Sequence, residues 1–203
     1  AGEDSPPCIF LKNIGQWENN ILYSATAPVS GVNVNFLSDG ISFGAAREVE
    51  EEEEESSDDL SEEHQDEYEK MVWNLYFKGK NKNAFIEVVN EQNSRINYIK
   101  GNIPSKWIKD VPQYSILQYT GIYDKTDLRY YGTRQCLKYD YILHVGADMR
   151  EIKMNYEGVR KISIAENGEM DIYLPWGVIK EHKPYSYQYV NGVKKELDVR
   201  YVI

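Results

Sequence analysis

The stretch ISIAENGEMDIYL, residues 162–174, carries the strongest hairpin signal in this chain. Two runs that alternate apolar and polar side chains, residues 162–165 and 170–174, flank the turn Glu166-Asn167-Gly168-Glu169. Asn-Gly between two such runs is a strong signal for a β-hairpin, because both residues tolerate the positive φ angles of tight hairpin turns. The stretch therefore predicts two antiparallel strands.

The same pattern recurs along most of the chain. Ser38-Asp39-Gly40 separates residues 32–36 from 41–45, and Asn191-Gly192 separates residues 185–190 from 195–202. Further strands are predicted at residues 71–78, 84–89, 95–99, 114–119, 128–131 and 137–144. No segment keeps a helical period of 3.6 residues. We therefore expect an all-β, antiparallel β-sandwich-like domain of about a dozen short strands.

Length and composition agree with this fold class. The chain has 203 residues, with 17 Tyr against 5 Phe and 4 Trp, and tyrosine favours the pleated surface of a sheet. This length suits one large or two small domains. We expect a single β-rich domain over residues 1–203, with two packed β subdomains, 9–100 and 113–203, as the alternative. No apolar run approaches the roughly 20 residues of a membrane-spanning helix, so no membrane span is predicted.

The net charge of -10 is concentrated in one segment. Residues 48–69 hold 14 of the 33 acidic residues and no Lys or Arg, which leaves 19 acidic against 23 basic residues elsewhere. We interpret residues 47–69 as a long acidic surface loop inserted between two strands, rather than as a cation-binding or solubilising segment. The remainder has no basic stripe with interleaved aromatic residues, so nucleic-acid binding is not expected.

The search for catalytic residues returns no specific motif. The three histidines, His64, His144 and His182, have no partners at catalytic or metal-ligand spacing, and no phosphate-binding glycine loop is present. We therefore predict no catalytic, cofactor-binding or metal-binding residues, and a protein that is not an enzyme. The alternative is a glycoside hydrolase that uses carboxylates from Asp124, Asp127 and Asp140. Carboxylates at such turns more often form the turn itself.

Four aromatic residues near the end of the chain form the candidate ligand face: Trp176, Tyr185, Tyr187 and Tyr189. The three tyrosines alternate along a predicted strand and must share one of its faces. Such a face can hold a glycan or a peptide. The alternative is that it belongs to the core or meets another domain.

The two cysteines, Cys8 and Cys136, leave two alternatives open. They form one disulfide across a long loop, or they are two unrelated thiols. Neither belongs to a Cys-x-x-Cys pair, so a zinc site is not supported.

Several motifs, in order along the chain, resemble a known family. They are FLKNIGQW at residues 10–17, YIKGNIPSKW at 98–107 and LKYDYILHVGAD at 137–148. Together they resemble the N-terminal domain of unknown function found in secreted Bacteroidetes surface proteins with SBBP (β-propeller) repeats and type IX sorting. In this chain the acidic insertion, Ile103 and the His144-Val145 pair depart from the family pattern.

The resemblance implies an extracellular or outer cell-surface location. It implies a non-enzymatic module for adhesion or surface assembly, whose partners are other domains of the same polypeptide or a surface protein complex. A carbohydrate-binding module that uses the exposed tyrosines and tryptophan is the alternative. The outside location favours a disulfide between Cys8 and Cys136. Among the motif residues, Trp107 is expected to close its loop onto the core and to find a partner for its N–H.

Overall fold

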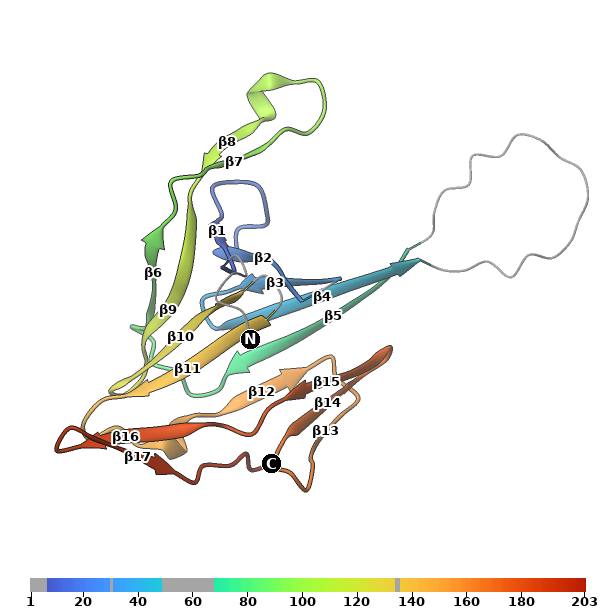
Figure 1. Cartoon of the computed structure of the whole chain (residues 1–203). Coiled ribbons are helices and arrows are strands. Elements are labelled where there is room, and N and C mark those ends of the chain that lie inside the picture. Colours follow the sequence, from blue (N-terminus) through green and yellow to red (C-terminus); the bar gives the residue numbers. More distant parts are fainter. Residues whose placement is uncertain (1–6, 30, 49–67, 134–135) are drawn as a thin grey trace, which may run out of the picture. The chain divides into compact units, whose positions relative to one another are not determined.

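The computed structural model describes residues 7–29, 31–48, 68–133 and 136–203. The chain divides into two units, Ala1–Asn155 and Tyr156–Ile203 (Figure 1). Within the described residues there are seventeen strands, joined by turns and by two short 3₁₀ helices, η1 (Pro104–Lys106) and η2 (Met149–Glu151). The all-β, sandwich-like prediction is confirmed. The strands outnumber the expected dozen because several, such as β1 (Phe10–Lys12), have only three or four residues.

The largest sheet has ten strands in the order β11-β10-β9-β1-β2-β3-β4-β5-β12, with β6 paired to β9 outside this path. Its strands after β1 are β2 (Tyr23–Val29), β3 (Val32–Phe36), β4 (Gly40–Glu48), β5 (Tyr68–Phe77), β6 (Phe85–Glu91), β9 (Gln113–Tyr123), β10 (Thr126–Thr133), β11 (Cys136–Leu143) and β12 (Met154–Glu157). The acidic segment joins β4 to β5, whose ladder closes with Glu48 opposite Tyr68. Residues 49–67, most of the predicted acidic loop, lie outside the described residues.

Strand β9 holds the first unit together because it pairs with three strands. Its residues 117–119 face β6 on one edge and β10 on the other, and its first residues pair with β1. The division between units therefore falls after Asn155. Strands β6 and β9 are partners across residues 100–113, the border between the two subdomains of the alternative prediction.

A continuous series of aromatic rings forms the core of the first unit. Phe10 meets Phe36 with ring centroids 5.4 Å apart, and Phe36 meets Tyr130 at 5.1 Å. Tyr130 contacts Tyr119 at 6.4 Å, and Tyr119 contacts Phe77 at 5.1 Å. All five side chains are buried and all four contacts are edge-to-face, the arrangement that the ring quadrupole favours. Strands β1, β3, β5, β9 and β10 are therefore joined by their side chains as well as by backbone hydrogen bonds.

A smaller apolar cluster supports the hairpin formed by β7 (Ile96–Tyr98) and β8 (Ile108–Val111). Its members come from the start of the chain, from the turn after β1 and from this hairpin: Ile9, Leu11, Trp17, Ile96, Tyr98, Ile108 and Val111. Trp107 lies just outside the cluster. As predicted, its N–H has a partner, the carbonyl oxygen of Gly101 at 3.1 Å. That bond lies within the hairpin's own tip, because residues 101 and 107 both belong to the connection between β7 and β8.

The second unit contains two small antiparallel sheets. One has three strands, β13 (Lys161–Ile164), β14 (Met170–Leu174) and β15 (Gly177–Glu181). Alternate side chains of the central strand β14, Met170, Ile172 and Leu174, are buried. The other sheet is the hairpin of β16 (Ser186–Val190) and β17 (Val193–Leu197). Both hairpins that the Asn-Gly turns predicted in this part of the sequence are present.

Candidate functional site

Tyr185, Tyr187 and Tyr189 form a row of exposed rings on the β16–β17 hairpin, here called the tyrosine ladder. Neighbouring ring centroids are 5.7 Å apart between Tyr185 and Tyr187 and 5.8 Å apart between Tyr187 and Tyr189. The three residues are 64%, 49% and 66% exposed. Alternation along the strand places them on one face, as predicted. The alternative, that this face belongs to the core, does not fit these exposed fractions.

The turn between the two strands sets the composition of this face. Asn191 and Gly192 have φ angles of 53° and 77°, the left-handed pair that a two-residue type I′ hairpin requires. The turn puts Val190 opposite Val193, and hence Tyr189 opposite Lys194 and Tyr187 opposite Glu196. Lys194 and Glu196 are not among the residues predicted for this face, although counting outward from the Asn191-Gly192 turn pairs each of them with a tyrosine.

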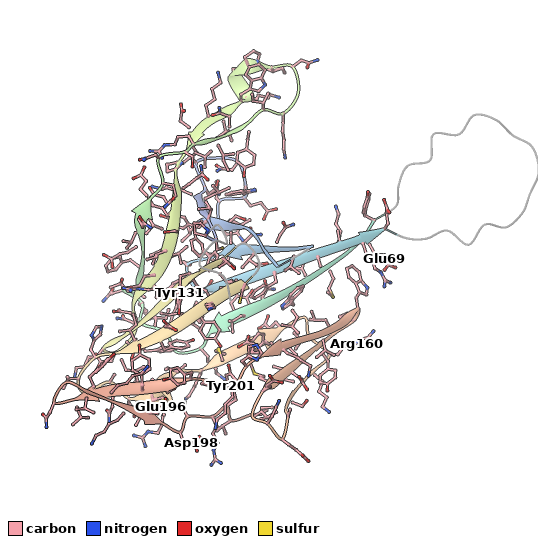
Figure 2. All side chains as sticks on the ribbon, viewed as in Figure 1. Glu69, Tyr131, Arg160, Glu196, Asp198 and Tyr201 are labelled. Atoms are coloured by element: carbon pink, nitrogen blue, oxygen red, sulfur yellow. The ribbon has the colours of Figure 1, made fainter. Side chains whose placement is uncertain are left out.

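Lys194 and Glu196 both contact the tyrosine ladder. The Lys194 ammonium lies 4.1 Å from the ring centroid of Tyr187 and 5.0 Å from that of Tyr185. A hydrogen bond with Tyr185, and then the charges of the nearby tyrosines, raise the pKa of Lys194 above its ordinary value. The Tyr185 hydroxyl donates to Glu196 Oε1 at 2.9 Å; Glu196 is labelled in Figure 2. The face thus combines aromatic rings with a cation and a carboxylate.

The hairpin that carries the ladder buries little of its own surface. All five residues of β17 are exposed. On the opposite face, Val193 and Leu197 are exposed as well. A hollow of about 430 Å³ adjoins Tyr185, between residues 183–186 and 196–198. An isolated two-stranded hairpin is marginally stable in water, so the ring contacts and the tight turn supply much of its local order.

Trp176, the fourth residue of the predicted ligand face, lies on another element. It is half-buried in the turn between β14 and β15, whereas the tyrosines belong to the β16 hairpin. The ring contacts within the ladder therefore unite three of the four predicted residues.

The predicted disulfide between Cys8 and Cys136 is absent, and both thiols are free. The end of β10, Gly132 and Thr133, lies between the two cysteines. The Cys8 N–H donates to the Gly132 carbonyl oxygen on one edge of β10, while Cys136 pairs with Thr133 on the other edge. Two strand spacings separate the cysteines by about 10 Å. A disulfide requires Cα atoms closer than about 7 Å.

The two thiols are expected to differ strongly in reactivity. Burial raises the pKa of Cys8 to about 11, so only roughly one Cys8 in a thousand is a thiolate at pH 8, while Cys136 is exposed. Ellman's reagent should therefore modify one thiol per native chain and two after unfolding in guanidinium chloride. The Cys136→Ser variant should lose the fast thiol. A native chain with no reactive thiol, and a mass two hydrogens below the reduced value, would contradict the structure.

Of the three carboxylates in the hydrolase alternative, Asp127 is the most constrained. Its Oδ1 accepts from the Gly121 N–H at 2.7 Å, and its Oδ2 lies 2.8 Å from His144 Nε2. Burial acts to raise its pKa, but the bonds to Gly121 and His144 outweigh burial, so the pKa lies below its ordinary value. Asp124 and Asp140 are exposed. With both oxygens of Asp127 engaged, the turn-forming role that its position suggested fits the geometry.

Within the part of the chain that the structure describes, no three His, Cys, Asp or Glu side chains gather as a metal ion would require. None of the described helices has the length and hydropathy to cross a membrane. His64 lies outside the described residues.

Comparison with known proteins places the chain in one family. Neither the curated proteins nor the solved structures contain a match to this chain. The model of a family described as "Domain of unknown function (DUF7948)" matches residues 10–203, nearly the whole chain. This confirms the expected near-full-length match to a domain of unknown function, whereas secretion, sorting and source stay predictions. The chain belongs to the DUF7948 family.

Proposed function

We propose that this chain is a non-enzymatic binding module of an extracellular or cell-surface multidomain protein, which holds a partner on the tyrosine ladder for adhesion or surface assembly. The observation that carries the proposal is the exposure of three rings in a row on one face of a hairpin, where Tyr187 contacts both of its neighbours. The motif resemblance supports the location.

The chemistry of the ladder suits a protein partner. Tyrosine is enriched at protein interfaces and in binding hot spots, because its ring offers a large apolar area and its hydroxyl a hydrogen bond. Lys194 and Glu196 add one charge of each sign beside the rings. A partner that packs on this face would also stabilise a hairpin that buries little surface of its own.

The test uses intact cells of the native source and beads that carry the purified chain. Wild-type beads should bind the cells, and Tyr187→Ala should lower bound cells at least about tenfold, since a hot-spot tyrosine contributes about 2 kcal/mol or more. Lys195→Ala is the matched control, because Lys195 pairs with Gln188 on the opposite face of the same hairpin. Circular dichroism establishes that both variants are folded. Equal binding by wild type and Tyr187→Ala would contradict the proposal.

Carbohydrate binding is the second candidate, favoured by Tyr189, the most exposed ring of the ladder. Sugars stack on ring faces, and the Lys194 ammonium already occupies that position at Tyr187. A glycan array should therefore give a stronger signal with Lys194→Ala than with wild type, and a weaker signal with Tyr185→Ala or Trp176→Ala. No signal above background in any of them would remove this candidate.

A further inference from the structure

The β7–β8 hairpin ends in a tip, residues 99–107, that lies away from the other strands of the first unit (Figure 1). The base of the hairpin is anchored by the cluster that includes Tyr98 and Trp17, whose ring centroids are 5.8 Å apart. Beyond Tyr98 the chain bends through the η1 turn and returns at Ile108. Backbone bonds from Lys106 to Ile103 and from Trp107 to Pro104 give the tip a defined conformation.

The tip exposes apolar side chains where a simple turn would carry polar ones. Ile99 is 58% and Ile103 51% exposed, and the indole of Trp107 is half-buried. These side chains lie on a projecting tip of nine residues that joins β7 to β8. The arrangement suits insertion into a soft interface better than docking against a flat protein surface.

The charged residues from position 95 to position 109 are all basic. Residues 95–109 contain four basic residues and no acidic one, in a chain whose net charge is -10. Arg95 is paired with Glu91 at the base. Among the described residues, Lys100, Lys106 and Lys109 form no ion pair, and the Lys109 ammonium lies 5.5 Å from the Trp107 ring centroid. Long lysine side chains can keep their ammonium groups in water while their stems follow an apolar surface.

We infer that the hairpin tip is a contact site for an anionic lipid surface. Ile99 and Ile103 enter the boundary between headgroups and acyl chains, and the Trp107 indole lies at headgroup level, where tryptophan is enriched. Lys100 and Lys106 meet the anionic headgroups. Residues 95–109 hold no acidic side chain that would offset this attraction, so the tip is the part of the hairpin that an anionic surface attracts. This inference goes beyond the proposed function and uses none of the ladder residues.

The test is co-sedimentation of the full chain with vesicles of phosphatidylcholine, with and without phosphatidylglycerol. Binding is expected only to the vesicles that contain phosphatidylglycerol, and it should weaken as salt screens the lysines. The double variant Lys100→Glu/Lys106→Glu should lower binding at least about tenfold. Lys80→Glu/Lys82→Glu, in the turn after β5, changes the net charge equally and should bind as wild type.

A second matched pair of variants tests whether the apolar side chains of the tip contribute to vesicle binding. Ile103→Asp should abolish binding, while Val145→Asp, at a residue 98% exposed in another turn, should lower it far less. Brominated lipid should quench wild-type fluorescence and quench Trp107→Phe much less. All these side chains are exposed or half-buried, so thermal melting should show folded variants. Absence of binding to either vesicle, or equal binding by the tip variants and their controls, overturns the inference and leaves an acidic protein as the partner to examine.

Discussion

Replacing Phe36 with alanine is expected to lower the free energy of unfolding of this protein by about 3–5 kcal/mol. Phe36 is fully buried at the end of β3 and is the second ring of the aromatic series, between Phe10 and Tyr130. Its removal leaves a cavity among rigid rings, which cannot turn to fill the space without losing their edge-to-face contacts. Denaturation in urea, followed by tryptophan fluorescence, measures the change.

The matched control for Phe36 is Phe85 in β6, which is 54% exposed. Phe85→Ala removes the same atoms from a site where water already reaches the ring. It should lower the free energy of unfolding by less than about 1 kcal/mol. Similar losses in the two variants would mean that the aromatic series is not the core of the first unit.

Replacing Gly132 with alanine is expected to lower the free energy of unfolding by about 3–5 kcal/mol, for two reasons that act together. A Cβ atom at this residue would lie 2.1 Å from the carbonyl oxygen of Cys136, which belongs to the backbone of β11 and cannot rotate away. The φ angle of 142° is also one that side chains with a Cβ rarely adopt. Relief of the clash would shift β11 or the contact between Gly132 and Cys8.

Gly79→Ala separates these two reasons. Gly79 has a φ angle of 75°, but no atom lies within 4 Å of the position that an alanine methyl group would take, so only the backbone cost of about 1–2 kcal/mol applies. The difference in unfolding free energy between the two variants then measures the clash with β11. Equal costs would mean that the end of β10 can move away from β11 freely.

The two proposed surfaces are tested by separate variants. The tyrosine ladder belongs to the unit Tyr156–Ile203 and the hairpin tip to the unit Ala1–Asn155. Loss of cell binding in Tyr187→Ala with normal vesicle binding would support the ladder alone. Loss of vesicle binding in Ile103→Asp with normal cell binding would support the tip alone. Failure of one proposal is therefore distinguishable from failure of the other.

Local turn chemistry explains which parts of the fold could be predicted. The Asn-Gly turns at residues 167–168 and 191–192 lie between strands only a few residues apart, so the signal and the structure are in the same stretch of chain. The pairing of β6 with β9, instead of with its predecessor β5, has no such local signal. It depends on which distant apolar faces can be buried together, and here β9 lies between β6, β10 and β1.

The candidate site divides in the same way. Strand alternation alone places Tyr185, Tyr187 and Tyr189 on one face, and the Asn-Gly turn adds Lys194 and Glu196. The exposure of that face required the tertiary structure, because exposure depends on what every other element covers.

Residue type and short spacing are sufficient to predict the all-β class, the hairpins with Asn-Gly turns, the shared face of the three tyrosines and the domain family. Long-range packing sets three other features: Cys8 and Cys136 lie on opposite edges of β10, the Trp107 N–H bonds within its hairpin tip, and β9 joins three strands. These features depend on contacts between residues far apart in the chain, and the loops that bring such residues together carry no local signal of where they lead.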